Sequence, residues 1–170
     1  MDDRDEDRGG RPPQGLRARA GAHEWGPGGG AAAAPAPQKV VLVCREDLPT
    51  AVAVNAAAVL GLSVGHHLPG RTGPDATDAS GTTYPGITTL PVPVLSAPAA
   101  EVAELFRRAR ADEQVATVVL TETARRAKTY EDYLEQARRV PHADTEPVAL
   151  AVYGPRNRVT RLTKHLPLLP

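Results

Sequence analysis

The chain has 170 residues, a length that suits one domain rather than two. Its 20 basic and 20 acidic residues balance, so the composition lacks the basic excess that is typical of general nucleic-acid-binding proteins. The single cysteine, Cys44, excludes an intrachain disulfide and no apolar run approaches the roughly 20 residues that span a bilayer, so we expect a cytoplasmic protein with no membrane segment.

Residues 1–38 are predicted to form a disordered tail. They contain blocks of charge followed by glycine, alanine and proline, with no β-branched residue and one aromatic residue, Trp25. Such a segment cannot bury enough apolar area to offset the entropy of ordering it. The alternative is an interaction arm with Trp25 as its anchor. A single α/β domain is predicted over residues 39–170.

The first ordered element is a continuous apolar run over residues 39–45, which is typical of a strand covered on both faces. A nearly apolar helix is predicted next, over residues 48–62. Gly61 and Gly65 are expected to end it, because glycine is common at helix C-termini.

Residues 63–89 are rich in Gly, Pro, Asp and Thr, and a segment of this length is expected to contain a hairpin or a functional lid. Proline alternates with valine over residues 91–95, a pattern consistent with an edge strand. An amphipathic helix is predicted to start at residues 96–98. A third buried strand at 115–121 and a helix at 129–140 follow.

A fourth strand is expected at residues 148–153, and Gly154 and Pro155 turn the chain into a last helix that includes residues 159–164. Strands that alternate with helices indicate a mostly parallel sheet with right-handed crossovers. We therefore predict an α/β fold, a three-layer sandwich around a mixed sheet of about four strands.

Several stretches together resemble a known family. Residues 39–48 read KVVLVCREDL, residues 55–62 read NAAAVLGL, residues 73–87 read GPDATDASGTTYPGI and residues 149–169 read ALAVYGPRNRVTRLTKHLPLL. They are similar to the bacterial family catalogued as domain of unknown function 2000. That family resembles the type II peptidyl-tRNA hydrolases in fold. The hydrolases likewise begin with a strand ending in Arg-x-Asp-Leu, and they end with a Gly-Pro turn and a helix closing on His-Leu-x-Leu-Leu.

The chain departs from the hydrolases where they bind and cleave their substrate. The hydrolases carry a lysine- and glycine-rich segment before Gln and His on the first helix, whereas residues 49–54 here read PTAVAV and no lysine lies between Lys39 and Lys128. The resemblance places Asn55 near the Gln and Glu122 at an acidic position. Loss of the cation removes phosphate attraction and transition-state stabilisation, so peptidyl-tRNA hydrolysis is the weaker hypothesis.

Ligands of α/β proteins collect beyond the carboxyl ends of the strands. We predict a binding site at this rim, formed by Arg45, Asp47, Asn55, Thr121, Glu122 and Tyr153. Arg45 would hold an anionic group, Asn55 and Glu122 would orient polar groups, and residues 66–86 would form a lid. The alternative is that these charged residues form surface ion pairs, which contribute little to stability.

The leading hypothesis is a non-hydrolytic binding or regulatory module for a small metabolite or a protein partner. The alternative is a hydrolase acting on a peptidyl-tRNA-like ester, with Glu122 or Asp47 as its general base, so whether the protein is an enzyme stays open. No cofactor is expected, and no metal, because the histidines and aspartates of residues 66–78 match no metal motif. A nucleic-acid partner is not expected, although the resemblance leaves tRNA open. A homodimer is considered because the apolar helical area is generous for so small a sheet.

Overall fold

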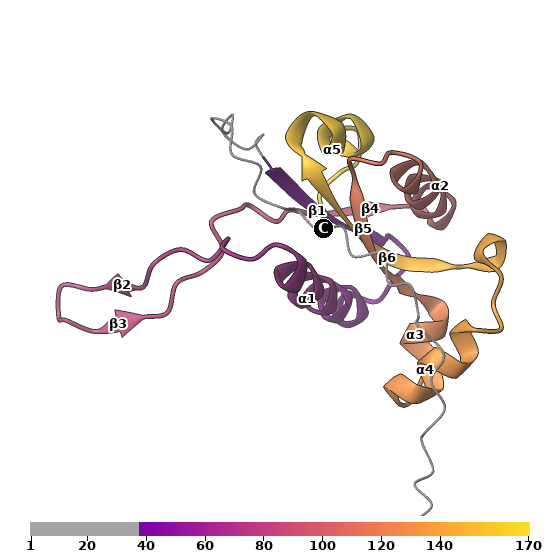
Figure 1. Cartoon of the computed structure of the whole chain (residues 1–170), viewed down its shortest axis with the longest axis horizontal. Helices are drawn as coiled ribbons and strands as arrows, with labels where there is room; N and C mark the ends of the chain where they lie inside the picture. The colour runs from indigo at the N-terminus through magenta and orange to yellow at the C-terminus, as the bar shows by residue number, and fades with distance from the viewer. Residues whose placement is uncertain (1–37) are drawn as a thin grey trace, which may run out of the picture. The chain divides into compact units, whose positions relative to one another are not determined.

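The computed structural model describes residues 38–170 (Figure 1). The predicted disordered tail, residues 1–38, lies outside the described residues except for Gln38, which is the first residue of strand β1 (Gln38–Arg45). The strand predicted at 39–45 is therefore confirmed and starts one residue earlier. The other strands of the main sheet are β4 (Val94–Ala97), β5 (Ala116–Thr121) and β6 (Pro147–Pro155).

The four strands form a mixed sheet, as predicted, and their order is β4-β1-β6-β5. β1 is parallel to β4, whereas β6 is antiparallel to both of its neighbours, β1 and β5. The prediction of a mostly parallel sheet with right-handed crossovers is wrong, because two of the three strand pairings are antiparallel and the β5–β6 connection does not cross the sheet. The short helices α3 (Glu122–Arg126) and α4 (Tyr130–Ala137) lie beyond the end of β5 instead of across the sheet (Figure 1). The chain therefore enters β6 from the edge at which it left β5.

One face of the sheet is covered by the long helix α1 (Thr50–His67). Its buried residues, among them Ala56 and Leu60, pack on Leu42 of β1 and Ala149 of β6. The predicted end near residue 62 is wrong, because the helix continues through both of its glycines. Neither glycine has a positive φ, and the apolar contacts that the helix makes with the sheet offset the roughly 1 kcal/mol that a helical glycine costs relative to alanine.

The opposite face is covered by α2 (Ala99–Arg110) and α5 (Arg156–Thr163), which gives the predicted three layers (Figure 1). The core between these helices and the sheet includes Val102 and Phe106 of α2, Val159 of α5 and Val152 of β6. Within residues 38–170, no helix combines the length and the apolar character that crossing a membrane requires.

Both outer strands of the sheet are edge strands. β4 was predicted as one, but β5 was predicted to be buried, and its residues from Thr117 to Leu120 are half-buried instead. The continuous apolar run at this position reflects contacts on both faces of the strand, Val119 with the α2–α5 side and Val118 with the α1 side. Only the outer edge of the strand lacks a neighbour.

The segment after α1 forms an arm, defined here as residues 71–89, which extends away from the sheet (Figure 1). It contains the predicted hairpin, made of β2 (Ala76–Thr77) and β3 (Thr83–Tyr84). Asp78 organises the tip, because its carboxylate accepts hydrogen bonds from the backbone N–H groups of residues 80 and 82 and from the Tyr84 hydroxyl.

Candidate functional site

Polar residues meet at the edge where β1 and β5 end and β6 begins, which we call the polar rim (Arg45, Asp47, Thr121, Glu122 and Glu146). Arg45 and Asp47 form a two-pronged ion pair, with Nε to Oδ1 at 2.9 Å and Nη2 to Oδ2 at 2.5 Å. This hydrogen bonding raises the pKa of Arg45 above its usual range, and the charges of Glu122 and Glu146 add to the effect. The two charged strand ends therefore share one electrostatic environment.

Glu122 is held by two arginines of its own helix. Arg125 Nε and Nη2 donate to its two carboxylate oxygens at 2.8 and 2.5 Å, and Arg126 Nε donates at 2.7 Å. The preceding Thr121 caps α3, since its hydroxyl accepts the Ala124 N–H at 3.1 Å. The hydrogen bond from Arg125, followed by that from Arg126, lowers the pKa of Glu122 to about 2 despite its partial burial.

The rim carboxylates are poor general bases in this arrangement. A general base works best with a pKa near the working pH. The pKa of Glu122 is about 2, and the hydrogen bond from Arg45 lowers the pKa of Asp47 below its usual value. Both carboxylates remain ionised at neutral pH and already form ion pairs with arginine. This arrangement corresponds to the alternative, surface ion pairs, that the sequence left open.

Acid unfolding should show what the Glu122 ion pairs contribute. Its folded pKa lies below the usual 4.5, so the unfolded state binds the proton more tightly, and the free energy of unfolding should fall as the pH drops from about 4.5 toward 2. In Glu122→Gln, the free energy of unfolding should lose the part of this decrease that comes from Glu122. Urea unfolding across that range checks it, with Glu131→Gln on the exposed surface of α4 as the control. Equal pH dependence in both variants would contradict the assignment.

Two of the predicted site residues lie away from the rim. Tyr153 pairs with Val40 and Ala116 at the opposite edge, because β6 runs antiparallel, and its ring stacks on His67 with centroids 6.5 Å apart. Burial raises the pKa of its hydroxyl. Asn55 is exposed on the outer side of α1, where it needs no buried partner.

The predicted lid over the rim is also wrong, because the arm follows the C-terminus of α1 and the rim lies near its N-terminus (Figure 1). Asp75 and Asp78 serve the arm itself: Asp75 accepts the Gly86 N–H at 2.9 Å. Among residues 38–170, no three His, Cys, Asp or Glu side chains are grouped so that they could hold a metal ion. The rim residue that the sequence missed is Glu146, which lies in the loop before β6 and follows no motif.

An apolar cleft of about 440 Å³ lies at the base of the arm, between α1 and the edge of the sheet that carries β4. Its apolar lining includes Val40, Leu42, Val64, Leu68, Leu90 and Val94. Pockets of this size, apolar with a few polar groups, are the usual form of small-molecule sites. The backbone of the arm is fixed beside the cleft, because the Arg71 carbonyl accepts the Thr89 N–H at 2.8 Å and the Thr89 hydroxyl at 3.1 Å.

The polar groups of the cleft are Arg71 and the hydroxyls of Thr72 and Thr88. Arg71 is half-buried, and no carboxylate in the described part of the chain forms an ion pair with it. A guanidinium in a largely apolar pocket attracts an anionic group, since pairing satisfies a charge that is partly removed from water. The sequence signal for this residue is its isolation: no other lysine or arginine lies between Arg45 and Arg107.

Gly61 and Gly65 line the cleft one turn apart on α1. A Cβ at either position would meet no atom within 4 Å, so packing does not require glycine there. Each glycine costs the helix about 1 kcal/mol relative to alanine. What the missing side chains provide in this structure is open volume in the cleft.

Comparisons with known proteins agree on the fold and are silent on activity. The family described as a protein of unknown function, DUF2000, matches residues 38–170. The structure of a protein of unknown function from Agrobacterium tumefaciens superposes with a TM-score of 0.70 at 18% sequence identity, over 77% of this chain and 96% of that chain. At this identity the likeness shows a shared fold. No match was found among curated protein sequences.

Proposed function

The chain belongs to the DUF2000 family of proteins of unknown function, and we propose that it is a non-hydrolytic binding module for a small amphipathic acid. The ligand would have a compact apolar body and one anionic group. The observation that carries the proposal is the apolar cleft of about 440 Å³ with the half-buried Arg71 among its lining residues. The cleft, not the polar rim, is the proposed site.

The chemistry of the lining supports this ligand class. Valine and leucine side chains from the sheet, α1 and the arm would take the apolar body away from water, at roughly 25 cal/mol for each Å² buried. Arg71 would pair with the anionic group, and Thr72 offers a hydroxyl hydrogen bond. The Thr88 hydroxyl already accepts the Leu90 N–H at 3.2 Å. A neutral or cationic ligand would leave the Arg71 guanidinium without its partner.

The hydrolase alternative rests on the resemblance to the type II peptidyl-tRNA hydrolases and on the acidic residues of the rim. The low pKa values of Glu122 and Asp47 weigh against either as a general base at neutral pH. Turnover of peptidyl-tRNA by the full chain, abolished by Glu122→Gln, would favour that alternative over ours.

Arg71→Gln should lower affinity for an anionic apolar probe about tenfold, the usual loss when one charge-assisted hydrogen bond is removed. The probe is 8-anilinonaphthalene-1-sulfonate, which has an aromatic body and one sulfonate and fluoresces when it enters an apolar site. Binding is measured by fluorescence titration, and displacement by octanoate is compared with displacement by the neutral octanol.

Octanoate should displace the probe better than octanol from the natural chain, and Arg71→Gln should remove that difference. The matched control is Arg139→Gln in the turn after α4, far along the chain from the cleft and exposed. Equal probe affinity in Arg71→Gln and the natural chain would contradict the role of Arg71 and would leave the apolar cleft without its anionic specificity.

Other expectations stay predictions. These are the cytoplasmic location, the bacterial source, a protein partner, and tRNA as a partner. The homodimer also stays a prediction. Apolar residues are exposed on the outer side of α1, where the side chains of Val54 and Leu62 are 59% and 79% exposed.

A further inference from the structure

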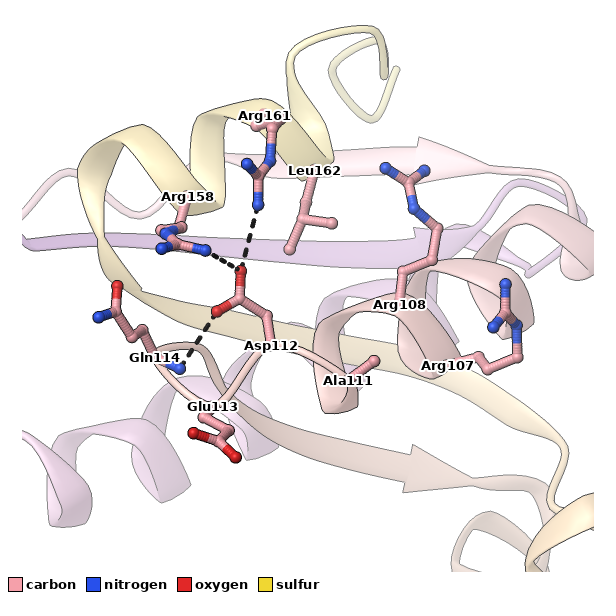
Figure 2. A pocket seen from close by; sticks show the side chains of 9 residues that line it. All are labelled: Arg107, Arg108, Ala111, Asp112, Glu113, Gln114, Arg158, Arg161 and Leu162. Atoms are coloured by element: carbon pink, nitrogen blue, oxygen red, sulfur yellow. Dashed lines mark hydrogen bonds and ion pairs between the residues drawn. The ribbon is translucent and has the colours of Figure 1, made fainter.

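A second concave surface lies on the other side of the sheet from α1. It is a polar groove of about 560 Å³ between the end of α2, the turn at residues 111–114 and α5 (Figure 2). Four of its lining residues are arginines: Arg107, Arg108, Arg158 and Arg161. They come from two helices that are about fifty residues apart in sequence, so the fold and not local sequence brings them together.

Asp112 holds two of these arginines side by side. Its Oδ2 accepts from Arg158 Nη1 at 3.1 Å and from Arg161 Nη2 at 3.3 Å, and its Oδ1 accepts the Gln114 N–H at 3.2 Å. Both guanidinium groups point toward this one carboxylate (Figure 2). Each guanidinium has five N–H donors, so each keeps donors for a further acceptor.

Arg108 stands across the groove from Arg161, with the Leu162 side chain between them (Figure 2). Within the described residues it forms no ion pair. Arg107 differs, because Glu104 already engages its guanidinium at 2.8 and 2.6 Å. The guanidinium groups of Arg108, Arg158 and Arg161 therefore border the groove with two carboxylates, the half-buried Asp112 and the exposed Glu113, which leaves an excess of one positive charge.

We propose that this groove binds the phosphate group of a small phosphorylated molecule, between Arg108 and the Arg158–Arg161 pair. A phosphate monoester is an anion at neutral pH with three acceptor oxygens, which suits the excess of positive charge and matches the number of guanidinium groups. A single carboxylate has two acceptor oxygens, one fewer than the number of these guanidinium groups. Arginines in the last turn of a helix also interact favourably with its C-terminal carbonyls, a role open to Arg107 and Arg108 of α2 and to Arg161 of α5. That role does not account for Arg158, which lies in the first turn of α5.

The test is a titration of the full chain with inorganic phosphate, in which binding is monitored through amide chemical shifts. Chloride keeps the ionic strength constant during the titration. We expect saturable shifts around residues 108–114 and 158–162. Arg108→Gln and Arg161→Gln should each weaken phosphate binding about tenfold. Arg139→Gln, which changes an exposed arginine in the turn after α4, should leave it unchanged. Arg108→Gln breaks no ion pair in the described residues, so it keeps the test valid if Arg161→Gln fails to fold.

A parallel titration with glucose 6-phosphate identifies the source of the phosphate: tighter binding than inorganic phosphate means an organic monoester, and equal binding means the free ion. Both results support the site. Shifts no larger than those caused by chloride would overturn the proposal. So would phosphate binding that survives both groove variants. A last control uses heparin, a polyanion. If heparin binds more strongly than phosphate, and if Arg139→Gln weakens heparin binding as much as Arg108→Gln does, the surface attracts polyanions in general and the proposal is overturned.

Discussion

Gly61→Leu is expected to abolish binding of the anilinonaphthalene probe, at least a hundredfold in affinity, without lowering the stability of the fold. A Cβ at this position meets no atom within 4 Å, and the position lines the cleft, so the leucine side chain would occupy the volume that the ligand needs. Replacing glycine inside a helix should raise the free energy of unfolding by about 0.8 kcal/mol. Loss of binding together with a gain in stability is hard to explain unless the cleft is the site.

The matched control is Ala58→Leu, which adds a leucine to the exposed outer side of the same helix. It should leave probe affinity unchanged within a factor of two. Fluorescence titration and urea unfolding of both variants measure the two quantities. Undiminished probe binding in Gly61→Leu, or an equal loss in Ala58→Leu, would show that the probe binds elsewhere, the exposed apolar side of α1 being the first candidate.

Gly154→Ala should give the largest loss of stability of any substitution we consider, roughly 3 kcal/mol or more. Gly154 has φ of +150°, a conformation that residues with a side chain rarely adopt. Its Cβ would also lie 2.6 Å from the Gln114 carbonyl oxygen, which is backbone and cannot move aside as a side chain can. The strain would fall on β6, which pairs with β1 and β5 and is the most buried strand of the sheet.

Gly70→Ala separates the two causes, because Gly70 has φ of +73° but its Cβ would meet no atom within 4 Å. It should cost about 1 kcal/mol from the backbone conformation alone. Chemical unfolding of the two variants measures the difference. Equal losses would mean that the close approach of the added Cβ to the Gln114 carbonyl oxygen is relieved at no cost, which would contradict this explanation.

The strands and the main helices could be predicted from sequence because each has a local signature. The apolar run of β1, the alternation of apolar and charged residues along α2, and the Gly154–Pro155 turn before α5 all identify their elements. The direction of β6 has no such signature. It depends on α3 and α4 remaining at one edge of the sheet, which follows from where they pack and not from any residue in β6 itself.

The candidate site could be predicted only in part, for the same reason. Arg45 and Glu122 follow strands that run in one direction, so the rule of strand ends placed them together. Tyr153 was misplaced because its strand runs the other way. The cleft depends on the two ends of the arm meeting at its base, where Thr72 pairs with Thr88, and sequence gives no local signal for that pairing. The isolated Arg71 and the glycines of an otherwise apolar helix were visible beforehand.

Mapping the anilinonaphthalene probe on the full chain by amide chemical shifts tests the central claim most directly, because it compares cleft and rim in one experiment. The account predicts saturable shifts that are largest at Gly61, Gly65 and Arg71, with the rim residues Arg45 and Glu122 unaffected. Shifts centred on the rim, or no saturable binding, would contradict the assignment of the cleft as the ligand site.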